Sequence, residues 1–152
     1  MINVGSKAPK FSLQDQNGAT HTLSQYQGKK VLLYFYPKDD TPGCTTEACN
    51  CRDGYYMFTK MGLVILGVSK DGVESHKKFA EKFLLPFPLL ADESTAVAQA
   101  YGVWKEKKFM GRKYMGINRT SFLIDEKGVI TKIYEGVKAN EHAKDVEGDL
   151  AR

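Results

Sequence analysis

The pattern of apolar and polar residues predicts two central strands and two main helices. Residues 31–36 and 63–69 are continuous apolar runs of the length typical of buried strands. Residues 73–83 place apolar side chains at helical spacing among charged ones, which predicts an amphipathic helix. A longer helix is expected from Thr41, a favoured N-cap residue followed by proline, to about Lys60.

Shorter elements complete the pattern. The remaining predictions are an N-terminal hairpin with strands near 11–13 and 20–23 around Gln16-Asn17-Gly18, an extended segment at 86–90, a short helix at 94–101 capped by Ser94, a hairpin of strands 121–125 and 129–134, and a helical tail from Ala139. This order indicates an α/β protein with a central mixed sheet flanked by helices. It is the outline of a thioredoxin-like fold with an N-terminal β-hairpin extension, formed by residues 1–152 as one domain.

Composition restricts the class of protein. With 42% hydrophobic and 26% charged residues, the 152-residue chain is typical of a soluble globular domain. No apolar run approaches the roughly 20 residues of a membrane span, and residues 1–7 do not resemble a signal peptide. We therefore expect a cytoplasmic protein without a membrane partner.

The net charge of +4 comes largely from two short basic stretches. These are Lys105-Glu106-Lys107-Lys108 and Arg112-Lys113. A solvated loop is favoured over a nucleic-acid site, because so local a patch falls short of an extended basic face.

Three cysteines cluster at positions 44, 49 and 51. An odd, clustered set does not match the framework of a secreted disulfide-rich domain, and it points to catalysis or metal binding. Cys44 follows a buried strand and lies in the first turn of the predicted helix, where unpaired N–H groups and the helix dipole favour a thiolate. Gly43 would let a substrate approach the backbone closely. The alternative is a small buried side chain, and we favour a nucleophile.

The position of Cys49 limits what it can do. In a straight helix, Cα atoms five residues apart are separated by roughly 8.7 Å, whereas a disulfide needs about 4.4–6.8 Å. A bridge to Cys44 would therefore require local unwinding, and Gly54 weakens the helix nearby. Core packing is the alternative for Cys49. It is the favoured interpretation for Cys51, which lies on the opposite side of the helix from Cys49.

Other cysteine chemistries fit less well. The spacing C-x4-C-x-C does not match paired zinc-ligand motifs, and His21, His76 and His142 are scattered, so no metal site is predicted. A C-x-x-C dithiol is absent, and no histidine is marked as the base of a cysteine hydrolase.

The motif Pro37-x3-Thr41-x2-Cys44 resembles the active-site signature of the peroxiredoxins. The stretch 41–49, together with 101–104, 108–111 and 116–125, is similar in order to the subgroup called bacterioferritin comigratory protein or peroxiredoxin Q. The resemblance covers nearly the whole chain.

The resemblance implies roles for the matching residues. Cys44 would be the thiolate that attacks the peroxide, Cys49 would resolve the sulfenic acid as an intrachain disulfide, and Thr41 would bind the peroxide and the sulfur. The other implied site residues are Pro37, which shields the centre from water, Arg119, which lies beside the sulfur, and Glu47, which orients the arginine. A guanidinium would stabilise both the thiolate and the leaving oxygen.

The resemblance also implies partners. Thioredoxin or a related dithiol protein would reduce the disulfide, no haem, flavin or metal cofactor would be needed, and the protein would be a monomer. The substrates would be hydrogen peroxide and organic hydroperoxides. Cys51 departs from the subgroup, which usually has an aromatic residue there, so a Cys44–Cys51 bridge stays a minor alternative. A peroxide-sensing thiol switch is the alternative function.

Overall fold

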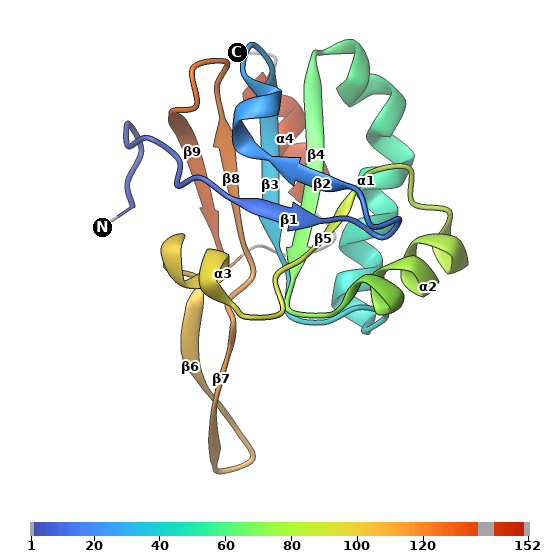
Figure 1. Cartoon of the computed structure of the whole chain (residues 1–152), viewed down its shortest axis with the longest axis vertical. Coiled ribbons are helices and arrows are strands. Elements are labelled where there is room, and N and C mark those ends of the chain that lie inside the picture. Colours follow the sequence, from blue (N-terminus) through green and yellow to red (C-terminus); the bar gives the residue numbers. More distant parts are fainter. Residues whose placement is uncertain (1, 137–141, 151–152) are drawn as a thin grey trace.

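A seven-stranded sheet forms the centre of the molecule, and a separate two-stranded hairpin extends from it (Figure 1). The structure is a computed structural model that describes residues 2–136 and 142–150. In chain order its elements are β1 (Ser12–Gln14), β2 (Thr20–Thr22), the 3₁₀ helix η1 (Leu23–Tyr26), β3 (Lys30–Phe35), α1 (Pro42–Lys60), β4 (Leu63–Ser69), α2 (Val73–Phe83), β5 (Leu89–Ala91), α3 (Ala96–Ala100), β6 (Trp104–Phe109), β7 (Arg112–Ile117), β8 (Thr120–Ile124), β9 (Ile130–Glu135) and α4 (His142–Leu150).

The sheet is mixed, as the sequence predicted. Its strand order is β2-β1-β5-β4-β3-β8-β9, with β3, β4 and β5 parallel and β8 and β9 antiparallel. The expected terminal hairpin is β8–β9, and the expected N-terminal hairpin is β1–β2, which joins the sheet through β5. Because β3 lies between β4 and β8, the carboxyl end of β3 has a neighbouring strand on each side.

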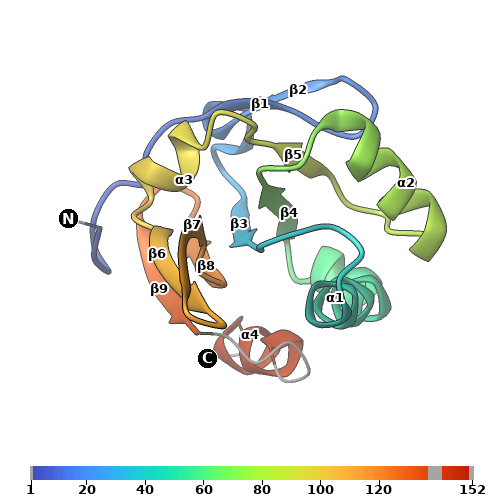
Figure 2. The same ribbon diagram turned by 90° about the horizontal axis from the view of Figure 1, so that it is seen from below.

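Helices cover both faces of this sheet (Figure 2). One apolar cluster joins α1, α2 and α4 to the side of β3 that carries Leu32, Tyr34 and Tyr36. The other joins α3 and the N-terminal segment to the side that carries Val31 and Leu33. The continuous apolar runs therefore reflect strands that are buried on both faces. The predicted thioredoxin-like arrangement is confirmed.

The predicted loop at the basic stretches is wrong, because these residues form the β6–β7 hairpin. Lysine is depleted in strands, and the stretch lacks the apolar alternation by which strands are recognised. The strands are joined by a two-residue turn in which Met110 and Gly111 both have positive φ, 50° and 80°, and only the glycine is typical of such a turn. A smaller difference is that α3 begins at Ala96, so Thr95 holds the N-cap position, although Ser94 Oγ accepts a hydrogen bond from the Ala96 N–H at 3.3 Å.

One further prediction concerns the C-terminal end of the pattern. The helical tail is confirmed over α4, while residues 139–141 lie outside the described residues. The 3₁₀ helix η1 was not predicted. Within residues 2–136 and 142–150, no helix is long and apolar enough to span a membrane.

Candidate active site

Cys44 lies in the first turn of α1, where the chain returns from the carboxyl end of β3. Thr41 is the N-cap residue in an extended conformation, and Pro42 is the first helical residue, as predicted. The side chain of Cys44 is buried, with the residue only 2% exposed. The sulfur thus lies at the positive end of a helix in a site largely shielded from water.

Arg119 reaches this sulfur from the short segment between β7 and β8, and β8 is the neighbour of β3 in the sheet. Its Nη2 donates a hydrogen bond to Cys44 Sγ at 3.2 Å, and its Nη1 donates to Glu47 Oε1 at 2.7 Å. Burial alone would lower the pKa of Arg119, but the neighbouring Glu47 and Cys44 raise it overall. The guanidinium is therefore a permanent positive charge in contact with the sulfur, as the resemblance implied.

Glu47 is almost completely buried one turn further along α1. Burial raises its pKa to about 7, even though the charge and hydrogen bond of Arg119 lower it. Its second oxygen, Oε2, is buried and has no hydrogen-bond partner among the described residues. An unpaired buried oxygen disfavours the ionised carboxylate.

We expect this carboxyl to make stability depend on pH. The pKa of Glu47 is about 7 in the folded protein, against an ordinary value of 4.5. The folded state therefore binds the proton of Glu47 more tightly than the unfolded state does. The stabilisation from this proton is complete below pH about 4.5 and is lost as the pH rises through about 7. The change in unfolding free energy should be about 3 kcal/mol, measured by urea unfolding at several pH values.

The Glu47→Gln variant should lack this part of the pH dependence. Glu81→Gln, which replaces an exposed glutamate on α2, is the matched control and should keep the wild-type slope. Equal slopes in wild type and Glu47→Gln would contradict the assignment of this titration to Glu47.

Gly43 makes room for the arginine. A Cβ at this position would lie 3.1 Å from Arg119 Nη2, closer than ordinary van der Waals contact. The sequence predicted that Gly43 allows a substrate to approach the backbone, and that role is untested. The structure adds a second reason for glycine here, which is the close approach of the guanidinium.

Thr41 and Pro37 lie in the segment between β3 and α1. The Thr41 hydroxyl donates a hydrogen bond to the Lys38 carbonyl at 2.9 Å. It makes no hydrogen bond that caps the helix, so Thr41 is the N-cap by position alone. Pro37 is half-buried at the end of the strand. Their roles toward a peroxide stay predictions.

A buried network that sequence reasoning missed anchors this segment. The Asp39 carboxylate accepts a hydrogen bond from the Tyr36 hydroxyl at 2.6 Å and from the Ser75 hydroxyl at 2.8 Å, and His76 Nδ1 lies 2.7 Å from it. His76 Nε2 lies 3.0 Å from the Leu90 carbonyl, to which it donates. The loop before Cys44 is therefore fixed to α2 and β5, which sets where α1 begins.

Lys107 and Tyr34 are further missed neighbours of the sulfur. Burial and the charge of Arg119 lower the pKa of Lys107, while Cys44 raises it, so this lysine of β6 lies within electrostatic range of the site. The Tyr34 hydroxyl is buried without a partner among the described residues, and its pKa is raised by burial and by Cys51, Glu47 and Cys44. No local motif marks either residue.

The other two cysteines differ in their surroundings. Cys49 is half-buried, and α1 continues unbroken from Cys44 past it. Cys51 is 1% exposed within the apolar cluster under α1, and burial raises its pKa. All three are free thiols in this structure. The surroundings of Cys51 are those of a core residue.

This protein has a thioredoxin-like fold and a cysteine at a helix N-terminus that accepts a hydrogen bond from an arginine. Such a site is typical of thiol-dependent peroxidases. The chain belongs to the AhpC/TSA family, whose model matches residues 4–133. It is 51% identical to the peroxiredoxin Bcp of Bacillus subtilis over 93% of this chain and 90% of that protein. The Bcp of Escherichia coli is 49% identical with the same coverage.

Solved structures agree with this family. Xylella fastidiosa PrxQ superimposes with a TM-score of 0.94 at 34% identity, covering 99% of this chain and 96% of that one. The bacterioferritin comigratory protein of Xanthomonas campestris, which has alkyl peroxide reduction activity, gives a TM-score of 0.88 at 38% identity over 93% and 90% of the two chains. The predicted peroxiredoxin subgroup is therefore confirmed, and the chain is a thiol-dependent peroxidase.

Proposed function

We propose that this peroxidase reduces hydrogen peroxide and organic hydroperoxides through Cys44, Cys49 and an external dithiol. The observation that carries the proposal is the hydrogen bond from Arg119 to the Cys44 sulfur at a helix N-terminus. The helix N-terminus and the guanidinium both place positive charge beside this sulfur, and the thiolate is the nucleophilic form of cysteine. The alkyl peroxide activity of the Xanthomonas campestris relative supports the substrate class.

The first step is attack of the Cys44 thiolate on one peroxide oxygen. A sulfur–oxygen bond forms, the O–O bond breaks, and the departing alkoxide or hydroxide takes up a proton. Arg119 lies where it can stabilise negative charge on the sulfur before the step and on the leaving oxygen during it. Thr41 and Pro37 are proposed to hold the peroxide and keep water away.

The second step joins Cys49 to the Cys44 sulfenic acid, and water leaves. A dithiol protein, thioredoxin or a relative, then reduces the disulfide. We propose that the single domain does this as a monomer in the cytoplasm, without a nucleic-acid or membrane partner. The clustered, non-scaffold cysteines support that compartment, where dithiol reductants are found.

Removal of Arg119 tests this mechanism. Arg119→Ala should lower the rate of peroxide reduction by about two to three orders of magnitude, because one such electrostatic contact is typically worth about 2.7–4 kcal/mol. The measurement is peroxide consumption by the wild type and the variant with thioredoxin, thioredoxin reductase and NADPH.

Arg52→Ala is the matched control, since Arg52 lies on the same helix as Cys44 but bonds to the Phe83 carbonyl and to Asp53. A loss below about threefold in Arg119→Ala would mean that the guanidinium is dispensable. Continuous NADPH oxidation by the wild type supports an enzyme, whereas one stoichiometric oxidation supports the alternative of a thiol switch.

A further inference from the structure

The β6–β7 hairpin extends away from the body of the molecule (Figure 1). Among the described residues, its two strands pair with each other and with no strand of the main sheet. A two-stranded ribbon is marginal by itself, and its outer edges expose unpaired backbone groups. A projecting ribbon of this kind adds little to the stability of the fold, which points to a role in binding.

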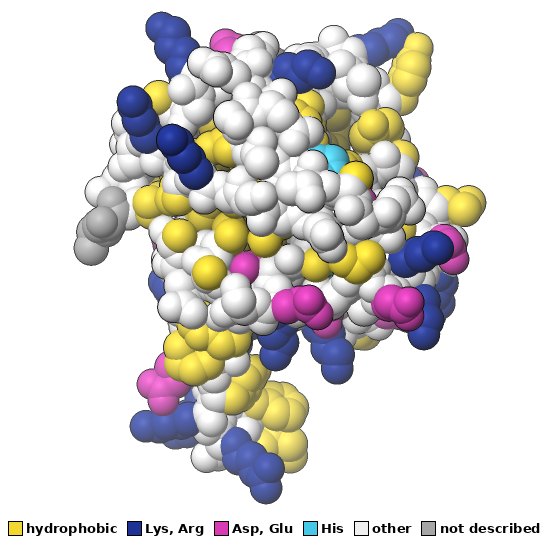
Figure 3. All heavy atoms as spheres, viewed as in Figure 1, with side chains coloured by type: hydrophobic (Ala, Val, Ile, Leu, Met, Phe, Trp, Pro, Cys, Tyr) yellow, Lys and Arg dark blue, Asp and Glu magenta, His cyan; other side chains and the backbone are white. Residues whose placement is uncertain are grey.

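The hairpin exposes large apolar side chains (Figure 3). The exposed fractions are 66% for Phe109, 88% for Met110, 49% for Tyr114 and 46% for Met115. The structure has three other exposed large apolar residues among those described, and these lie apart from one another in the sequence, at Val4, Tyr56 and Leu84. Clustered apolar exposure of this kind marks an interaction surface.

The hairpin also carries the net charge of the chain. Residues 104–117 contain five of the 22 basic residues and one of the 18 acidic residues, which leaves seventeen of each elsewhere. The charge of +4 is therefore the charge of this hairpin. A partner would be negatively charged, and a second copy of this chain would be repelled at the same surface.

One face of the hairpin carries Lys107, which lies within electrostatic range of the catalytic sulfur. Lys107 and Phe109 lie two residues apart on β6, and Tyr114 is the cross-strand partner of Lys107, so the three side chains share a face. β7 ends at Ile117, two residues before Arg119, which bonds to the Cys44 sulfur, so the base of the hairpin adjoins the site. Cys44 and Arg119 also act electrostatically on Lys107. A body bound to the face would lie next to the cysteine helix.

We propose that the site-facing side and tip of the hairpin are the docking surface for an acidic dithiol protein that reduces the enzyme. The inference rests on the proposed function, in which an external dithiol must reach the Cys44–Cys49 bridge. A thiolate of the partner attacks one sulfur of the bridge, and a mixed disulfide forms while the other enzyme sulfur leaves as a thiolate. The second thiol of the partner then displaces the enzyme, so two electrons pass from the dithiol to the disulfide.

The test separates protein docking from chemistry. The triple variant Lys105→Glu/Lys108→Glu/Arg112→Glu reverses three exposed charges of the hairpin, of which Lys105 and Arg112 lie on the site-facing side and Lys108 lies beside the tip. Its kcat/KM for an acidic thioredoxin should fall about tenfold or more, and the wild-type value should fall with added salt. Peroxide turnover with the small dithiol dithiothreitol should not change, because no docking surface is needed.

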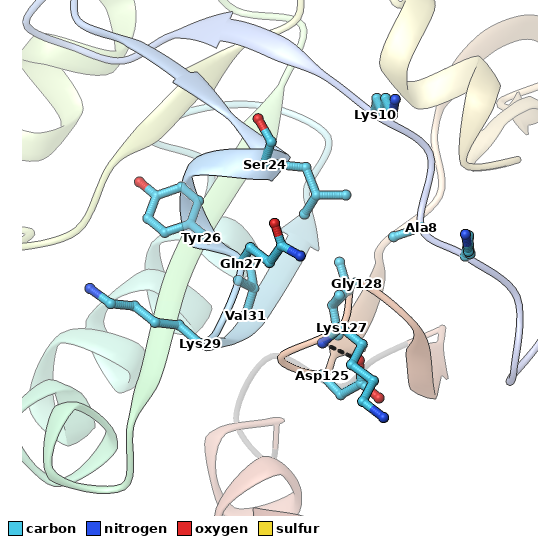
Figure 4. A pocket seen from close by; sticks show the side chains of 13 residues that line it. Ala8, Lys10, Ser24, Tyr26, Gln27, Lys29, Val31, Asp125, Lys127 and Gly128 are labelled. Atoms are coloured by element: carbon cyan, nitrogen blue, oxygen red, sulfur yellow. Dashed lines mark hydrogen bonds between the residues drawn. The ribbon is translucent and has the colours of Figure 1, made fainter.

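A matched control lies on the part of the molecule that is distant from Cys44. Lys7, Lys10 and Lys127 line a cavity of about 220 Å³ near the start of β3, whereas Cys44 follows the end of that strand (Figure 4). The variant Lys7→Glu/Lys10→Glu/Lys127→Glu makes the same change in net charge and should keep most of the activity with thioredoxin.

The apolar contribution is tested separately. Phe109→Ser/Met110→Ser should also weaken thioredoxin-dependent turnover, and Leu84→Ser, at a similarly exposed apolar position at the C-terminal end of α2, should not.

Three results would overturn the proposal. The first is equal activity of the two triple variants with thioredoxin, and the second is loss of the dithiothreitol reaction in the hairpin variant. The third is hairpin-dependent binding to vesicles of anionic phospholipid with unchanged thioredoxin kinetics, which would assign the surface to a membrane. A wild type that fails with dithiothreitol would contradict the proposed function itself, which is a different outcome.

Discussion

Cys44→Ser should abolish peroxide reduction and leave the fold intact. A serine hydroxyl is not ionised near neutral pH and does not attack an O–O bond as a thiolate does. The substitution changes one buried atom, and the new oxygen can still accept the hydrogen bond of Arg119. We expect no peroxide consumption above the uncatalysed rate, with either thioredoxin or dithiothreitol as reductant, and a thermal unfolding midpoint close to that of the wild type.

Cys51→Ser is the matched control for this prediction. It makes the same chemical change on the same helix, at a site with 1% exposure in the apolar cluster. It should lower stability by about 1–3 kcal/mol, because it buries a hydroxyl, while peroxide reduction continues. Activity near the wild-type level in Cys44→Ser would show that another residue is the nucleophile.

The sequence predicted the fold where packing is strongest. The strands β3 and β4 are continuous apolar runs because both of their faces are covered. An amphipathic helix would contain polar residues at regular intervals, so the strand interpretation is favoured for these runs. The hairpin β6–β7 was missed because only its base, at Trp104 and Ile117, packs against the core, so most of its positions are exposed and show no alternation of apolar and polar residues. Its strands are held by backbone pairing and by the turn at Met110 and Gly111.

The site could be predicted only in part from local sequence. The helix N-terminus at Cys44 follows from Thr41 and Pro42, which are adjacent to it. The contact with Arg119 joins residues 75 positions apart, and only the family resemblance indicated it. The Asp39–His76 network and Lys107 depend on how three separate elements pack, which no motif records.

The second large effect concerns Cys49. Cys49→Ser should allow one oxidation of Cys44 to a sulfenic acid and then stop turnover with thioredoxin, because no disulfide forms for the partner to reduce. The trapped sulfenic acid should be prone to further oxidation to the sulfinic acid. The measurements are NADPH oxidation in the coupled assay and the mass of the protein after one equivalent of peroxide.

Disulfide formation requires the first turns of α1 to unwind, since Cys44 and Cys49 lie five residues apart on an unbroken helix. The intrinsic helix propensity of this stretch is low, because Thr45, Thr46 and Asn50 are all poor helix formers. Unwinding nevertheless has a cost. It would expose the buried Ala48 and break the Glu47–Arg119 ion pair.

We therefore expect the oxidised enzyme to show faster amide exchange over about residues 45–52, with the sheet unchanged. In Cys49→Ser the same dose of peroxide should leave exchange in this segment as it was, because the change depends on the bridge and not on oxidation of Cys44. Peptide mapping of the oxidised wild type should join Cys44 to Cys49. A Cys44–Cys51 bridge, or a bridge between two chains, would remove the resolving role from Cys49, and thioredoxin turnover would then survive in Cys49→Ser.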